Sequence, residues 1–127
     1  RMEYVKKAAR FAKEAGIEDI VIHGGFIPNN PFSADYEVMV SVIKELCDYC
    51  KALGVNVLLE TGGETSVALL RLITDTGCNN LFVNLCSAVN PTFLERSNGV
   101  SKRCTLSELL NIISEIFGVV YVLIVLS

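Results

Sequence analysis

The chain has 127 residues, and 51% of them are hydrophobic, which is enough material for the buried core of one domain. Its 11 basic and 14 acidic side chains give a formal net charge of −3 and a pI near 5.1. This balance provides no broad cationic surface, so it argues against nucleic acid and anionic membranes as partners and favours a soluble protein that handles small molecules.

The first predicted element is a helix over residues 2–15, with apolar residues near one face and charged residues on the others. Gly16 follows it and is typical of a helix stop. Because the helical pattern is already under way at Arg1, we expect the chain to be a fragment.

A short apolar strand is predicted over residues 17–22, and it runs into His23 before two glycines break it. Residues 26–31 have the proline and asparagine content of a loop. A long helix then begins, and either Ser33 or Asp35 can cap it. Its apolar stripe follows helical spacing: Met39, Ile43, Leu46, Cys50 and Leu53.

Gly54 ends this helix, and a second apolar strand over residues 55–59 finishes on Glu60. A third helix is predicted to begin near residues 64–66 and to stop at Gly77. Its expected buried side consists of Val67, Leu70 and either Ile73 or Thr74.

A third apolar strand over residues 81–85 leads to Cys86. By this point the chain has repeated the same order of helix, glycine, apolar strand and polar residue. This repetition is typical of an α/β fold with parallel strands joined by helical crossovers. The pattern then stops. Residues 91–103 are polar and irregular, residues 105–117 are predicted to form a helix, and residues 119–126 are predicted to form a buried strand.

These patterns divide the chain into residues 1–90, a series of βα units, and residues 91–127, an aberrant C-terminal segment whose origin the pattern leaves open. The most apolar stretch, residues 117–126, is shorter than the roughly 20 residues that span a bilayer, so no membrane partner is expected. No signal peptide pattern is present at the start.

Five cysteines, an odd number without a small secreted framework, favour reduced thiols and a cytoplasmic location. Cys47 and Cys50 have C-x-x-C spacing, but they lie within the predicted long helix, and Cys50 is on its apolar stripe. Because no second cysteine pair or spaced histidines accompany them, two buried thiols are favoured over a zinc site.

Polar residues stand at the carboxyl ends of the predicted strands: His23, Glu60 and the segment 84–86. Ligands bind at this end in parallel α/β folds, so these residues are expected to meet at one mouth. A histidine and a carboxylate there suit a divalent metal with a sugar-like substrate, because the metal polarises a carbonyl while the carboxylate moves a proton.

Each of these residues also has a purely structural interpretation. His23 is as compatible with a hydrogen-bonded structural role as with a functional one. Glu60 favours function, because a carboxylate directly after a buried strand is costly to bury unless it is paired or bound to metal. Glu64 is as well explained by capping the following helix as by a substrate contact.

Two other enzyme classes lack their motifs. The His23-Gly24-Gly25 run is similar to the oxyanion-hole loop of lipases and esterases, but the chain has no G-x-S-x-G nucleophile turn. Glycine-rich phosphate-binding loops are absent as well.

Taken together, residues 20–28, 58–65 and 79–85 resemble the central part of a sugar phosphate isomerase/epimerase of the xylose isomerase-like TIM-barrel family. The resemblance covers about residues 1–90. It implies a fragment, about half, of a (β/α)8 barrel, since a closed barrel takes about 250 residues. It also implies metal-dependent proton transfer next to the carbonyl of a small-molecule sugar or sugar phosphate.

The resemblance implies that Glu60 is both a metal ligand and a catalytic acid/base carboxylate, and that His23 binds substrate. The implied cofactor is a divalent metal: manganese, magnesium or zinc. Cys86 falls where the family has a metal-binding aspartate, and a thiolate suits a hard, oxygen-preferring cation poorly. The family's metal-binding histidine and second glutamate have no counterpart in the chain.

Two alternatives remain open. One is a non-catalytic truncated or pseudoenzyme chain that forms a homo-oligomer to cover its open sheet edges. The other is an endonuclease-IV-like barrel, a class that needs several more histidines and a basic groove. A single histidine and a net charge of −3 argue against the second alternative.

Overall fold

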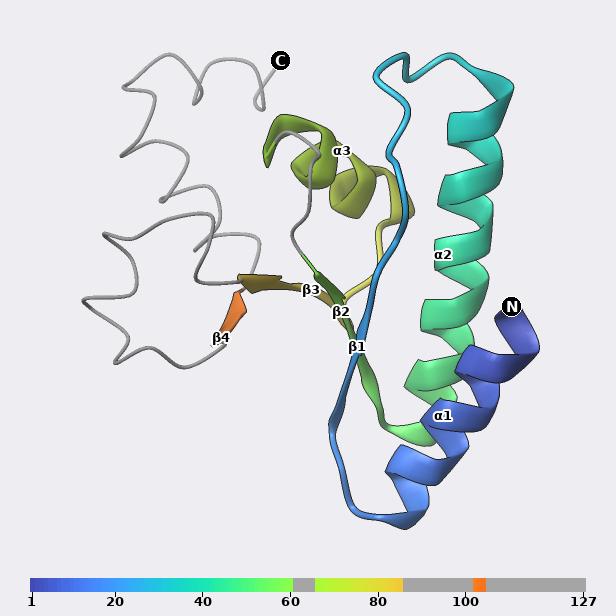
Figure 1. Ribbon diagram of the computed structural model, residues 1–127, viewed down its shortest axis with the longest axis vertical. Helices are drawn as coiled ribbons and strands as arrows, with labels where there is room; N and C mark the ends of the chain where they lie inside the picture. The colour runs from blue at the N-terminus through green and yellow to red at the C-terminus, as the bar shows by residue number, and fades with distance from the viewer. Residues whose placement is uncertain (61–65, 86–101, 105–127) are drawn as a thin grey trace.

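The computed structural model describes residues 1–60, 66–85 and 102–104 (Figure 1). Within these ranges, helices and strands alternate in the predicted order from the first helix to the third strand. The elements are α1 (Met2–Glu14), β1 (Asp19–Ile22), α2 (Ala34–Leu53), β2 (Asn56–Glu60), α3 (Ser66–Thr76), β3 (Leu81–Leu85) and β4 (Lys102–Cys104).

The strands form one sheet in the order β1-β2-β3-β4. β1 pairs with β2 and β2 with β3 in parallel, which confirms the predicted α/β architecture of parallel strands with helical crossovers. β4 pairs with β3 in the antiparallel direction.

The prediction of irregular chain over residues 91–103 is wrong for the last two of these residues, because β4 begins at Lys102. The Lys-Arg-Cys sequence of β4 has no apolar alternation, so its strand conformation comes from pairing with the distant edge of β3. The expected helix over residues 105–117 and the expected strand over residues 119–126 lie outside the described residues.

Local hydrogen bonds explain where the elements begin and end. Ser33 is the residue that caps α2, because its hydroxyl accepts a hydrogen bond from the Tyr36 N–H at 3.3 Å, whereas Asp35 lies within the first turn. Gly54 ends α2 with a left-handed φ of 73°. β1 starts at Asp19, two residues later than predicted, because the Ile17 N–H still donates to the Ala12 carbonyl at the end of α1.

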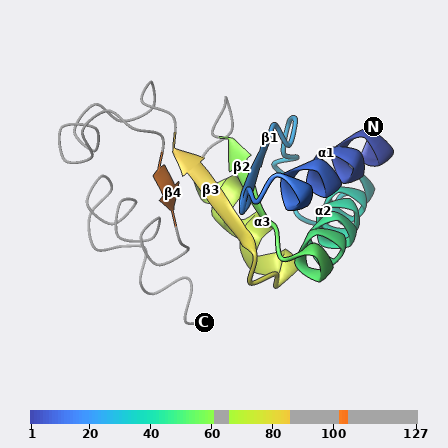
Figure 2. The same ribbon diagram turned by 90° about the horizontal axis from the view of Figure 1, so that it is seen from below.

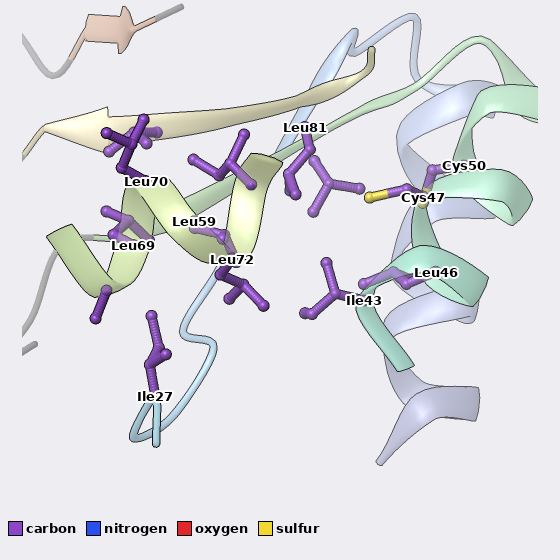
Figure 3. Packing of buried hydrophobic residues seen from close by; sticks show 14 of the residues in the cluster. Ile27, Ile43, Leu46, Cys47, Cys50, Leu59, Leu69, Leu70, Leu72 and Leu81 are labelled. Carbon is purple, nitrogen blue, oxygen red and sulfur yellow. The ribbon is translucent and has the colours of Figure 1, made fainter. Parts of the chain in front are cut away.

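The core lies between the helices and one face of the sheet, and Figure 2 shows α1 and α2 side by side there. The sheet contributes Val57, Leu59, Leu81 and Val83, with Ile20 and Ile22 packed partly buried against them. Figure 3 shows residues of α2 and α3 meeting in this cluster, with Ile27 beside them. On α3, Leu70 and Ile73 are buried as predicted, whereas Val67 and Thr74 are exposed.

Cys47 and Cys50 are free thiols buried in the core, in agreement with the structural interpretation of the C-x-x-C spacing (Figure 3). Burial is the main cause that raises the pKa of both thiols. The backbone carbonyl of Cys47 accepts a hydrogen bond from the buried Asn80 side chain at 2.9 Å, and the same amide donates to the Val55 carbonyl at 3.3 Å. Asn80, which precedes β3, is therefore tied both to α2 and to the residue that precedes β2.

Among the described helices, none combines the length and the apolar character needed to cross a membrane.

Candidate functional site

The parallel register places the strand-end residues in one row. Ile22 pairs with Leu59, so His23 and Glu60, which follow them directly, lie at the same level of the sheet. Glu60 in turn pairs with Asn84 on β3. The structure thus brings together His23, Glu60 and Asn84 at the carboxyl end of three neighbouring strands, as the sequence predicted.

Alternation along the strands indicates which face this row occupies. Ile20, Ile22 and Leu59 pack against the helices, so the residues between and after them belong to the opposite face. Val21 is on that face and is 51% exposed. His23 and Glu60 follow the same alternation, so they are placed on the face that the helices do not cover.

His23 is held by its own backbone. The Gly25 N–H donates a hydrogen bond to His23 Nδ1 at 3.0 Å, and Gly25 has a φ of +80°. The imidazole is otherwise exposed. One ring nitrogen is therefore engaged locally, while the other is available to a ligand.

Glu60 is the last residue of β2 and is only partly buried. Water still reaches Glu60, so the residue does not need a charged or metal partner to offset burial, in contrast to the expectation from the sequence. No residue in the described ranges forms a hydrogen bond or ion pair with its carboxylate. Its oxygens can thus accept a cation or a substrate hydroxyl.

Asn84 already takes part in an interaction within the chain, so it is not an unoccupied ligand group. Its backbone is in register with Arg103 on β4. Cys86 and Glu64, the other two residues considered at the strand ends, lie outside the described residues. In the described part of the chain, no group of three or more His, Cys, Asp or Glu side chains is arranged to hold a metal ion.

The loop after His23 is anchored by a residue that the sequence analysis missed. Arg71 on α3 donates hydrogen bonds to the carbonyls of Pro28, at 2.8 Å, and Asn29, at 3.2 Å. Its guanidinium also lies over the ring of Tyr36, 4.9 Å from the centroid. An arginine between buried leucines on a helix was the available signal, since such a cation needs partners.

Tyr36 completes this anchor. It is 3% exposed, and its hydroxyl donates to Asp75 Oδ2 at 2.6 Å. Burial, followed by the hydrogen bond to the Asp75 carboxylate, raises the pKa of Tyr36 to about 12. α2, α3 and the loop at residues 28–29 are thereby fixed to one another beside the strand ends.

Comparisons with known proteins agree with this geometry. The family model described as xylose isomerase-like TIM barrel matches residues 1–88. No curated protein matches the chain.

Three solved structures are similar to this chain, each over only a part of its own length. A xylose isomerase domain protein from Planctomyces limnophilus is 30% identical, with a TM-score of 0.66 over 80% of this chain and 40% of that one. An L-ribulose 3-epimerase is 21% identical, with a TM-score of 0.54 over 66% of this chain and 32% of that one. A D-allulose 3-epimerase from Methylomonas sp. is 18% identical, with a TM-score of 0.56 over 78% of this chain and 41% of that one.

The chain thus spans 40% and 41% of the length of two of these structures and 32% of the third. The two epimerases support the fold alone, because their identity to this chain is low.

Proposed function

Because the chain belongs to the xylose isomerase-like TIM-barrel family, we propose that its strand ends form part of a site for isomerising or epimerising a sugar or sugar phosphate. The observation that carries the proposal is the row of His23, Glu60 and Asn84 at the carboxyl end of parallel strands. In barrels of this kind, catalytic groups come from the ends of several strands.

In this proposal, Glu60 moves the proton next to the substrate carbonyl. It is a carboxylate that is partly exposed, and it lies on the face that the helices leave open. A carboxylate in this position can take a proton from the carbon beside a carbonyl and return it to a neighbouring atom. His23, one strand away, binds an oxygen of the substrate. The described residues do not identify the second acid/base group.

A divalent cation, manganese, magnesium or zinc, is part of the proposal, with Glu60 as one ligand. The fit is partial: Glu60 supplies a hard carboxylate oxygen of the kind that Mn²⁺ and Mg²⁺ prefer, but the described residues provide no group of three ligands. Further ligands would come from water, from substrate oxygens or from residues outside the described ranges. When bound, the cation would polarise the substrate carbonyl.

Cation binding gives the first test. In calorimetric titrations of the whole chain with Mn²⁺, we expect Glu60→Gln to weaken binding by more than about 100-fold, since loss of even an outer-shell partner costs about 10–100-fold. Glu37→Gln is the matched control, because Glu37 is an exposed glutamate in the first turn of α2 and the same charge is removed. Equal affinities for the two variants would contradict the role of Glu60.

The alternative is a non-catalytic chain that self-associates to cover its sheet edge. Among the described strands, β1 stands at the end of the sheet order, so a second copy could pair with the edge that no described strand occupies. Absence of Mn²⁺ binding at millimolar concentration, together with a dimer in sedimentation experiments, would support this alternative over the catalytic one.

A further inference from the structure

The hydrogen bond from the Gly25 N–H to His23 Nδ1 constrains the tautomer of the ring as well as its position. A backbone N–H is always a donor, so His23 Nδ1 must offer its lone pair at the 3.0 Å contact. In the neutral imidazole, one nitrogen carries the proton and the other accepts. A neutral ring that accepts this hydrogen bond at Nδ1 carries its proton on Nε2.

The conformation of Gly25 makes this contact available. Its φ of +80° lies in the region that other L-residues rarely adopt. A Cβ built at Gly25 would meet no atom of the described residues within 4 Å, so glycine is needed here for its backbone conformation and not for space. Gly24 differs, because a Cβ there would lie 3.5 Å from Leu59 Cδ2 and its φ is not in that region.

We propose that Gly25 is a positioning residue that holds His23 as the Nε2–H tautomer, so that His23 donates a hydrogen bond to a substrate oxygen and does not ligate the metal. The part about substrate rests on the function proposed above. The part about the tautomer rests only on the His23–Gly25 geometry.

The distinction follows from the lone pairs of the ring. A metal binds a ring nitrogen through its lone pair. The Nδ1 lone pair is already used by the Gly25 N–H, and Nε2 carries the proton. The exposed Nε2–H of the ring is thus a neutral hydrogen-bond donor, which suits a hydroxyl, carbonyl or phosphate oxygen of a sugar. Of His23 and Glu60, only the carboxylate then offers lone pairs to a cation.

Nuclear magnetic resonance tests this directly, because His23 is the only histidine in the chain. In the ¹⁵N-labelled full chain with a neutral ring, we expect one tautomer, protonated at Nε2, and a scalar coupling across the hydrogen bond between the Gly25 amide nitrogen and His23 Nδ1. Absence of this coupling, or a ring that averages between both tautomers, would overturn the proposal.

Two variants at Gly25 separate conformation from bulk. Gly25→Asn is expected to keep the coupling, because asparagine tolerates positive φ. Gly25→Val is expected to lose it, because a β-branched residue is an outlier at positive φ, and the space around the Cβ is open in both cases. Equal couplings in the two variants would show that the positive φ of Gly25 does not hold the ring.

Two variants at His23 distinguish the roles of its two ring nitrogens. Asparagine places its oxygen where Nδ1 accepts, and glutamine places an amide donor near the position of Nε2. With D-allulose as the probe, we expect His23→Gln to retain more of the binding than His23→Asn, by several-fold in Kd. The reverse order would overturn the donor role.

Failure of the proposed function can be told apart from failure of this inference. If the coupling is present but D-allulose leaves the Nε2–H signal unchanged, the tautomer stands and the substrate role is overturned. If Zn²⁺ removes the Nε2 proton and the coupling persists, His23 is a metal ligand and the donor assignment is wrong.

Discussion

Replacing Leu72 with alanine is expected to lower the free energy of unfolding by about 2–5 kcal/mol. Leu72 on α3 is 0% exposed and belongs to the cluster that joins the helices to the sheet (Figure 3). Truncation removes apolar burial and leaves a cavity that the rigid sheet beneath it fills only partly. Urea unfolding followed by circular dichroism measures the change.

Val67→Ala on the same helix is the control, since Val67 is 38% exposed. We expect a loss of less than about 1 kcal/mol for this variant, because part of its surface is already in water. If both variants unfold at the same urea concentration, α3 does not pack on the sheet as described, and the placement of the strand-end row loses its support.

Removing the Tyr36 hydroxyl is the second change with a large expected effect. In Tyr36→Phe, the Asp75 carboxylate loses the donor at 2.6 Å, and a hydrogen bond to a charged group contributes about 1.5–3 kcal/mol. We expect a loss of this order at neutral pH. The arginine that anchors the loop at residues 28–29 lies over the same ring, so the variant should also increase amide exchange in that loop.

The loss of stability caused by Tyr36→Phe should become smaller at high pH. The folded state raises the pKa of Tyr36 from 10.0 to about 12, so it favours the neutral phenol. The resulting stability is fully present below pH 10 and is lost as the pH rises through about 12. The difference between the native chain and Tyr36→Phe should therefore shrink over this interval.

Tyr4→Phe serves as its control, because Tyr4 is 79% exposed on α1. Urea unfolding curves for this variant should coincide with those of the native chain below pH 10. A constant difference between the native chain and Tyr36→Phe from pH 8 to pH 12 would contradict the assigned environment of Tyr36.

The spacing of apolar residues predicted the helices and the three parallel strands, because local sequence determines where these elements form. The stripe of α2 at Ile43, Leu46 and Cys50 is buried, and Gly54 ends the helix in the left-handed conformation. Boundaries were less accurate where two signals compete: Ile17 has a strand-like side chain, but its N–H still belongs to the hydrogen bonds that close α1. β4 could not be predicted, because its pairing partner on β3 is distant in the sequence.

The candidate site divides in the same way. The row of His23, Glu60 and Asn84 follows from the rule that parallel strands end at one edge, so the sequence was sufficient to find it. The state of each side chain required the structure. The bond from Gly25 to His23 depends on a positive φ, and the Arg71 anchor depends on contacts between α3 and a loop more than forty residues away.

The most direct test of the account is the location of bound Mn²⁺, measured by paramagnetic broadening of the amide signals of the ¹⁵N-labelled chain. Asp19 and Asn56 provide an internal reference, because they lie about 13 Å from the row, at the opposite ends of β1 and β2. We predict that the signals of His23, Glu60 and Asn84 broaden first, and that Glu60→Gln abolishes this selectivity. Broadening centred on Asp19, or unchanged by Glu60→Gln, would contradict the claim that these strand ends form the site.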